Sequence, residues 1–190
     1  MSKTKKVLAL VLAVMMLFTM ASFPAFAAES QKLDLKSIAT VTAKNDGGHP
    51  PARMIDGNLD TTYEDEWSGE TPTVTATFQL NGDYAIDKIV VYVGKGTGKS
   101  PKDVKAEVSA DGETYTEFGY ENFVETYPGN KDNWEWSGTK ATFESVAVSG
   151  VRFVRLTFTR NGYRVAIREV EMYGKKIPKD PVTYTIRYVD

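Results

Sequence analysis

Residues 74 to 80 read VTATFQL, a segment in which apolar and polar side chains alternate strictly. A period of two is typical of a β-strand with one face in the core and one in solvent. Further segments rich in β-branched or alternating residues lie at 86–93, 104–109, 141–148, 151–159 and 165–173. Turn-forming sequences separate several of them, namely Asn81-Gly82-Asp83, Ala110-Asp111-Gly112 and Asn161-Gly162. Because no long stretch has a helical period, we predict an all-β fold, an antiparallel β-sandwich.

The N-terminus has the pattern of a secretory signal peptide. Lysines provide a basic start, residues 7–20 form an apolar run, and Ala25 and Ala27 are the small residues that a signal peptidase reads. The apolar run, about 14 residues long, is shorter than the ~20 that a membrane-spanning helix needs, and no second long apolar segment follows. We therefore predict a signal peptide at 1–27, no membrane span, and a bacterial protein that is secreted or held at the cell surface.

The composition of the remaining chain excludes several classes of protein. Residues 1–27 contain three lysines and no acidic residue, so residues 28–190 carry 20 basic and 25 acidic side chains, a net charge of −5. This balance argues against a nucleic-acid partner. The sequence has no cysteine, so disulfides cannot stabilise an exported domain of this size. We expect one domain at 28–174, held by packing or by packing and a bound ion, as a monomer or as part of a larger multidomain chain.

Residues 56–67, DGNLDTTYEDEW, concentrate acidic, amide and hydroxyl side chains. Three interpretations compete: a solvated loop, a pair of catalytic carboxylates, and a cage of oxygens around a hard cation. Two catalytic carboxylates need a fixed separation across the scissile bond, whereas adjacent side chains of an extended segment point in alternate directions. We therefore interpret Glu64, Asp65 and Glu66 as a solvated charge run.

The first residues of the same stretch favour a cation. Asp56, Asn58, Asp60 and Thr61 supply carboxylate, amide and hydroxyl oxygens, the ligands that Ca²⁺ prefers. The calcium loop of helix-loop-helix proteins does not fit, because its sixth position should be glycine and is Thr61, and its twelfth should be glutamate and is Trp67. A calcium site of a different design remains open.

The stretch ARMIDGNLDTTYEDEW resembles the Ala-x-x-x-Asp-Gly-Asn-x-x-Thr-x-aromatic loop of discoidin-like domains, the coagulation factor 5/8 type C family. It is most similar to bacterial carbohydrate-binding modules of family 32, in the galactose-binding-like superfamily. The strands follow the order of that family over about residues 36–174, from VTATFQL and IDKIVVYV to VRFVRLTFT and IREVEMYG. The resemblance implies a jelly-roll β-sandwich that binds glycans, galactose-type sugars among them, and that does not catalyse a reaction.

The resemblance also implies a structural Ca²⁺. Its ligands, by position, are the backbone oxygens of Arg53, Asn58 and Arg168, the hydroxyl and carbonyl of Thr61, and the carboxylates of Asp56 and Glu169. Glu169 shares strand parity with Ile167 and Tyr173, so its carboxylate is expected to point where apolar neighbours point. A buried carboxylate needs a partner, and a cation would be one. The alternative is an ion pair with an arginine such as Arg155.

Loop aromatics and polar residues mark the expected glycan site, because sugar rings stack on aromatic side chains and polar groups fix the hydroxyls. The candidates, all from loops expected at one end of the sandwich, are His49, Trp67, Trp134, Trp136, Tyr163 and Arg164. Each tryptophan of the segment 127–138 is as consistent with a plug over the sandwich edge as with a sugar contact. Arg152 and Arg155 lie within a strand, and we interpret them as structural.

Residues 175–190 read as a linker followed by the start of a further strand. Their segment VTYTIRYVD resembles the opening strand of small repeats in mucin-binding and other cell-surface proteins of Gram-positive bacteria. A second function therefore stays open, that of a cell-surface adhesion domain binding a protein or a lipid head group. We do not expect an enzyme, because the chain offers no cysteine nucleophile, a single histidine and no Gly-x-Ser-x-Gly turn.

Overall fold

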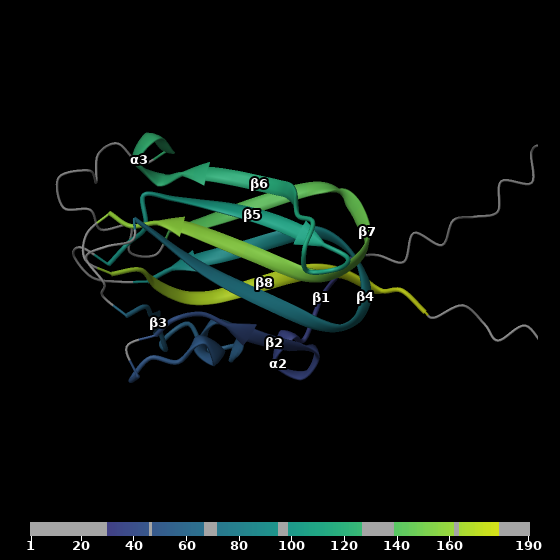
Figure 1. Cartoon of the computed structure of the whole chain (residues 1–190), viewed down its shortest axis with the longest axis horizontal. Coiled ribbons are helices and arrows are strands. Elements are labelled where there is room, and N and C mark those ends of the chain that lie inside the picture. Colours follow the sequence, from purple (N-terminus) through teal and green to yellow (C-terminus); the bar gives the residue numbers. More distant parts are fainter. Residues whose placement is uncertain are drawn as a thin grey trace, which may run out of the picture.

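The computed structural model describes residues 30–45, 47–66, 72–94, 99–126, 139–161 and 164–178. It is built mostly of antiparallel strands, which run roughly along the long axis of the molecule (Figure 1). The helices of the described ranges are short: α2 (Leu35–Ile38), η1 (Pro51–Ile55) and α3 (Phe123–Thr126). None of them has the length and apolarity needed to cross a membrane.

Two long strands, β4 (Thr73–Val93) and β7 (Lys140–Thr159), form the spine of the fold. They pair antiparallel along nearly their whole length, from Thr73 opposite Thr159 to Tyr92 opposite Lys140. The register of this pair shifts at several points between Gln79 and Lys88, so the ribbon is bent near its middle. The expected turn at Asn81-Gly82-Asp83 is therefore a bend within one continuous strand.

The remaining strands add to opposite halves of this bent ribbon. β2 (Ala39–Thr42) pairs with the first half of β4, β5 (Asp103–Ser109) with the second half of β7, and β6 (Thr116–Asn122) with β5. β8 (Ala166–Lys176) pairs with the second half of β4 and carries β1 (Gln31–Lys32) and β3 (Tyr63–Glu64). Because the spine is bent, the two halves of the sheet enclose one core, which confirms the predicted antiparallel β-sandwich.

The alternation of residues 74–80 is confirmed in detail. Val74, Ala76, Phe78 and Leu80 are buried and the residues between them face outward or are half-buried. The same core takes fully buried aromatic rings from other elements, namely Tyr63, Phe123 and Phe158. The predicted turn after β5 is also present: Asp111 accepts hydrogen bonds from the backbone of Glu113 and Thr114, both at 2.8 Å, and these lower its pKa to about 2.

Both ends of the described domain meet at the bend of β4. The Ser30 hydroxyl donates to Asp87 Oδ1 at 2.6 Å, and the Ile177 backbone N–H donates to the Asp83 carbonyl at 2.7 Å. β3 and the start of β8 lie at the other end of the long axis (Figure 1). The segments that flank the domain therefore join it at the end opposite to β3.

Among the described glycines, Gly174 on β8 has the closest backbone neighbour, and this contact predicts a specific destabilisation. A Cβ at Gly174 would lie 2.0 Å from the Ala85 carbonyl oxygen, whereas a Cβ at Gly82 would meet first the flexible Lys176 side chain at 3.2 Å. We expect Gly174→Ala to lower the free energy of unfolding by at least about 1–3 kcal/mol, because strand β8 must move away from β4. Gly82→Ala is the control and should change it by less than about 1 kcal/mol. Chemical denaturation of both variants measures the difference, and equal stabilities would contradict the close approach.

Candidate functional site

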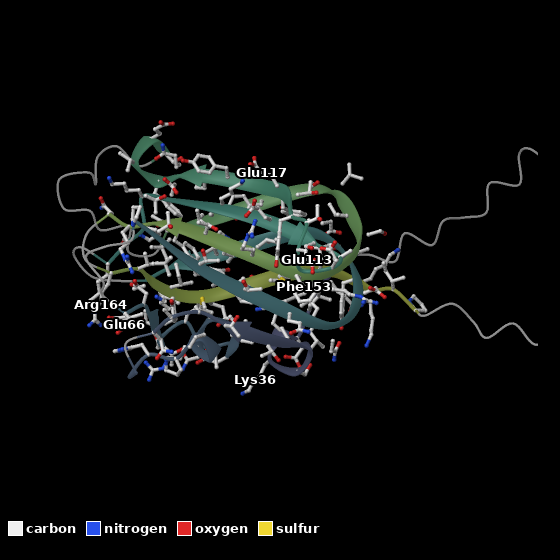
Figure 2. All side chains as sticks on the ribbon, viewed as in Figure 1. Lys36, Glu66, Glu113, Glu117, Phe153 and Arg164 are labelled. Carbon is white, nitrogen blue, oxygen red and sulfur yellow. The ribbon has the colours of Figure 1, made fainter. Side chains whose placement is uncertain are left out.

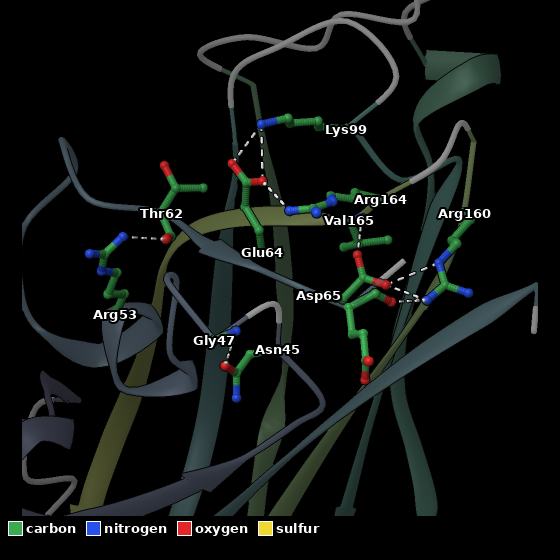
Figure 3. Close-up of polar contacts among 11 residues, drawn as sticks. Asn45, Gly47, Arg53, Thr62, Glu64, Asp65, Lys99, Arg160, Arg164 and Val165 are labelled. Carbon is green, nitrogen blue, oxygen red and sulfur yellow. Dashed lines mark hydrogen bonds and ion pairs between the residues drawn. The ribbon is translucent and has the colours of Figure 1, made fainter. Parts of the chain in front are cut away.

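Glu64 of β3 is the centre of a charged cluster at the end of the domain opposite to its termini (Figure 3). The residue is only 6% exposed. Its two carboxylate oxygens accept hydrogen bonds from Lys99 Nζ at 2.8 and 2.9 Å, and Arg164 donates to one of them at 3.3 Å. The Glu64 backbone N–H donates to the His49 carbonyl at 3.4 Å. Two cations thus contact the buried carboxylate of Glu64, and the segment of His49 contacts its backbone.

Asp65, the next residue, points the other way and is fully buried. Its carboxylate accepts hydrogen bonds from Arg160 Nε at 3.0 Å, from Arg160 Nη2, and from the Val165 backbone N–H. Arg160 also donates from its guanidinium to the Glu66 carbonyl at 3.1 Å and from its backbone to the Pro72 carbonyl at 2.8 Å. This pair ties together the segments that end at Glu66, begin at Pro72 and lead into β8.

The prediction of a solvated charge run is wrong for Glu64 and Asp65. It holds only for Glu66, which is exposed and lies at the same end of the domain as Arg164 (Figure 2). The alternation of side-chain direction was expected, but each of the two buried carboxylates meets a cation far away in the sequence. Lys99, Arg160 and Arg164 are 35 to 100 positions from their partners. No local pattern in the sequence marks these pairs, and Lys99 and Arg160 were not among the candidate residues.

The described part of the candidate glycan site contains two of the six expected residues. His49, through its backbone, and Arg164, through its guanidinium, both contact Glu64. A cavity of about 270 Å³ opens beside the Asp65–Arg160 pair and is lined in addition by Lys44 and Thr73 to Thr75. The other expected ligand contacts lie outside the described residues: Trp67, Trp134, Trp136 and Tyr163.

The expected calcium loop forms a compact turn after η1. The Asp56 carboxylate accepts the Asn58 backbone N–H at 2.8 Å and the Thr61 hydroxyl at 2.7 Å. The Asn58 carbonyl also lies 2.9 Å from that hydroxyl. Three of the six expected ligand residues therefore turn their oxygens toward one another within six positions. Tyr63, the aromatic residue that ends the loop motif, is fully buried in the core.

Glu169 and Arg168 of β8 contact this loop, although they follow it by more than a hundred positions in the sequence. Glu169 Oε2 accepts the Gly57 backbone N–H at 3.1 Å, and Arg168 donates to the Leu59 carbonyl. Glu169 is 5% exposed, and no ion pair to it is found among the described residues. Burial, with a contribution from the negative charge of Asp56, raises the pKa of Glu169 to about 7, although the Gly57 N–H and the charge of Lys32 act to lower it. Within the described ranges Lys32 forms its ion pair with Glu171, so the Glu169 carboxylate has no ion-pair partner there, which is the condition that a cation would relieve.

The set fits Ca²⁺ in the chemistry of its donors. Asp56 and Glu169 give the carboxylates, Thr61 gives a hydroxyl, and the remaining expected ligands are carbonyls, that of Arg53 on η1 among them. No group of three or more His, Asp or Glu side chains within the described ranges is placed to hold a metal. The expected ligand set contains two carboxylates, and its other oxygens come from a hydroxyl and the backbone. A cavity of about 340 Å³ borders Asp56, Gly57 and Glu169.

The direction of Glu169 differs from the sequence expectation. Residues 170 and 172 of β8 face the core, and Glu169 shares the other face with Glu171 and Tyr173. Its parity with the buried Ile167 is broken by an irregularity in the pairing of β8 with β4, where Glu169 lies opposite Tyr92 and Ile167 opposite Val93. Glu169 therefore lies beside the loop after η1 and the N-terminal segment instead of in the core.

The arginines of β7 are structural, as interpreted from the sequence. Arg155 donates to Glu107 at 2.9 Å and Arg152 to Asp83 at 2.5 Å. The alternative pairing of Glu169 with Arg155 is therefore wrong.

Comparisons with known proteins agree with this geometry. The family model described as the F5/8 type C domain matches residues 37–170. Among solved structures, a family 32 carbohydrate-binding module of a family 31 glycoside hydrolase from Clostridium perfringens superposes with a TM-score of 0.62 at 19% identity. It covers 76% of this chain and 95% of that one. No curated protein matches the chain in sequence.

Two further solved structures are complexes with sugars. The family 32 module of NanJ from C. perfringens, in complex with galactose, has a TM-score of 0.60 at 16% identity and covers 76% of this chain and 99% of that one. The family 32 module of AlyQ, in complex with 4,5-unsaturated mannuronic acid, has a TM-score of 0.55 at 21% identity and covers 75% and 97%. At these identities the similarity establishes the fold.

The buried Asp65–Arg160 pair predicts a large loss of stability on truncation. Asp65→Ala leaves a guanidinium that is only 10% exposed without its partner and should cost about 3–5 kcal/mol in the free energy of unfolding. The control is Asp83→Ala, which removes the exposed pair with Arg152 and should cost less than about 1 kcal/mol. Urea titrations followed by fluorescence compare the two, and a similar small loss for both would show that the pair does not brace this end of the domain.

Proposed function

The chain belongs to the F5/8 type C domain family. We propose that it is a non-catalytic carbohydrate-binding module and that it binds glycans at the Glu64 end of the sandwich. One observation carries this proposal: on a fold shared with carbohydrate-binding modules, a buried carboxylate holds Lys99 and Arg164 beside the segment of His49. Donors fixed in this way suit the hydroxyl and ring oxygens of a sugar, since polar groups that are already in place lose little entropy on binding.

Four aromatic residues from neighbouring loops are candidates for stacking against a sugar. In the sequence, Trp67 directly follows Glu66 and Tyr163 directly precedes Arg164. Trp134 and Trp136 lie a few positions before Thr139. We propose that at least one of these rings stacks on the apolar face of a pyranose, which adds about 1 kcal/mol or more beyond the hydrogen bonds. Galactose and an unsaturated mannuronic acid are the sugars bound by two similar structures, so neutral and acidic saccharides are both candidates.

We propose that the loop of Asp56, Asn58 and Thr61 holds a structural Ca²⁺ together with Arg53, Arg168 and Glu169. When bound, the ion supplies the positive charge that the two carboxylates lack and links the loop to β8. The support is the buried Glu169 and its contact with the loop backbone. Since this link adjoins η1 and β3, the ion would stiffen the segment that leads to Glu64.

We also propose that the module is exported and forms part of a larger protein. The basic, apolar and small-residue pattern of residues 1–27 supports export from a bacterium, and the segment after residue 174 supports a place in a larger cell-surface or secreted protein. Weak single-site binding would then be strengthened by several modules acting together.

Glycan binding is tested with an array and two tryptophan variants. Residues 28–178 should bind a subset of glycans, and Trp134→Ala or Trp136→Ala should weaken the best interaction by about tenfold or more, because a stacking platform is lost. Val146→Ala serves as control, since Val146 is 90% exposed on β7, close to Val148, which pairs with Ile86 at the bend of β4. If the wild type bound no glycan but bound lipid vesicles or a host protein, the adhesion alternative would replace this proposal. New reducing ends after incubation would indicate an enzyme.

Metal removal tests the calcium site. A chelator should lower the melting temperature of the wild type by several degrees, because an ion bound only by the folded state stabilises it, and added Ca²⁺ should restore it. Glu169→Gln should abolish the response to Ca²⁺ without unfolding the domain, since an amide relieves the buried negative charge. Glu144→Gln, an exposed change on β7, should respond like the wild type. Identical melting curves for metal-free and Ca²⁺-loaded wild type would refute the site.

A further inference from the structure

A cavity of about 270 Å³ borders Asp65, whose carboxylate points away from that of Glu64 (Figure 3). Asp65 directly follows Glu64 in the chain, so the cavity adjoins the proposed glycan site without being lined by the Glu64 cluster. Its volume is just below the roughly 300–1,000 Å³ of pockets that take drug-sized ligands. A unit as small as one sugar ring therefore suits it.

One wall of this cavity is the Asp65–Arg160 ion pair. The side chains of Asp65 and Arg160 are 0% and 10% exposed, and Asp65 also accepts the Val165 backbone N–H. The Arg160 backbone N–H donates to the Pro72 carbonyl at 2.8 Å, which fixes the pair to the segment that leads into β4. Because the two charges of the pair oppose each other and the pair is held on several sides, this wall is rigid and shows no preference for an ion.

The other side of the cavity carries polar groups that face water. Thr73 and Thr75 of β4 line it together with Lys44, which follows β2, and all three residues are exposed. No hydrogen bond from either threonine hydroxyl is found within the described ranges. β4 pairs with β7 at both threonines, and the Lys44 carbonyl accepts the Tyr63 hydroxyl. The backbone under these groups is therefore fixed, while the groups themselves are available to a ligand.

The spacing of the two threonines matches a sugar ring. They occupy successive outward positions of one strand, so their side chains are roughly 6.5–7 Å apart, twice the rise per residue. A pyranose presents hydroxyls on opposite sides of its ring and can therefore meet both. A threonine hydroxyl donates and accepts, as a sugar hydroxyl does, and the threonine methyl groups offer apolar contact to the C–H groups of the ring.

We infer that this cavity is a second sugar subsite, which binds a neutral unit through Thr73, Thr75 and Lys44, and that the module recognises at least two adjoining sugars of one chain. The inference rests on the proposed glycan site and deepens it. A saccharide that fills both positions loses its translational freedom only once, so each added contact increases the affinity. A single sugar gains contacts at the Glu64 end alone.

Calorimetry on saccharides of increasing length tests the subsite. The probes are galactose, β-1,4-linked galacto-oligosaccharides of two to four units, and the corresponding series of the best glycan on the array. We expect the wild type to bind a di- or trisaccharide about tenfold tighter than the monosaccharide. The double variant Thr73→Val, Thr75→Val should lose about tenfold for the oligosaccharide and less than about twofold for the monosaccharide, because each hydroxyl gives one neutral hydrogen bond.

The same face of the sheet provides a matched control. Thr40 of β2 is an exposed threonine opposite Gln79 of β4, nearer to the bend than Thr75, and its substitution by valine makes the same chemical change. Thr40→Val should therefore bind every saccharide like the wild type. For the ammonium, Lys44→Met should weaken only the oligosaccharide, whereas Lys175→Met, an exposed change on β8 opposite Ala85, should weaken none.

A titration of the wild type followed by NMR locates the subsite without any variant. The oligosaccharide should shift the amide and methyl signals of Thr73 and Thr75, and the monosaccharide should shift signals near Glu64 and leave those of the threonines in place. Equal affinity for all chain lengths, unmoved threonine signals, or an equal loss in Thr40→Val would overturn the second subsite, while glycan binding itself would stand. Binding to neither saccharide series and to no glycan on the array would remove the proposed function and this inference together.

Discussion

A carboxylate removed from water must meet positive charge or strong hydrogen-bond donors, and this constraint organises the whole loop end of the domain. Three buried acidic residues satisfy it in three ways. Glu64 draws in Lys99 and Arg164, and Asp65 draws in Arg160 and a backbone N–H. Glu169 receives only the Gly57 N–H among the contacts described, and we propose that a metal ion supplies the missing charge there. These contacts hold segments that are far apart in the sequence at one end of the domain.

The sheet makes such convergence possible. The bent β4–β7 ribbon lets strands attach to both of its halves, so the segments that leave the strands at one end meet there although they are far apart in the sequence. β3 contributes only two residues, yet its pairing with the start of β8 sets Glu64 opposite Ala166. A short strand beside a long one thereby fixes the position of the charged cluster.

The fold was largely predictable from the sequence, because its signal is local. The alternation at Val74 to Leu80 and the turn at Asp111-Gly112 report directly on which side of a strand faces the core and where the chain reverses. The continuity of β4 through Asn81-Gly82-Asp83 was not predictable, since it depends on the partner strand β7. The outward direction of Glu169 likewise depends on a local irregularity between β8 and β4.

The candidate site was predictable where a motif places oxygens a few residues apart, as in Asp56, Asn58 and Thr61. The burial of Glu64 and Asp65 was missed, because charged residues in series normally face water and their partners come from other strands. Only tertiary structure shows that Lys99, Arg160 and Arg164 reach them. The resemblance to a family indicated which end of the molecule carries the candidate site. The ion pairs within that site became visible only in the structure.

The placement of the two flanking segments has a mechanical consequence. Ser30 and Ile177 are both fastened at the bend of β4, so a polypeptide attached on either side pulls on the same point of the domain. Tension between neighbouring parts of a longer chain would pass through this corner and not through the Glu64 cluster, which is about ten strand residues away, because Ala166 pairs with Glu64 and Lys176 with Tyr84. Contacts at the far end of the domain would therefore carry none of this load.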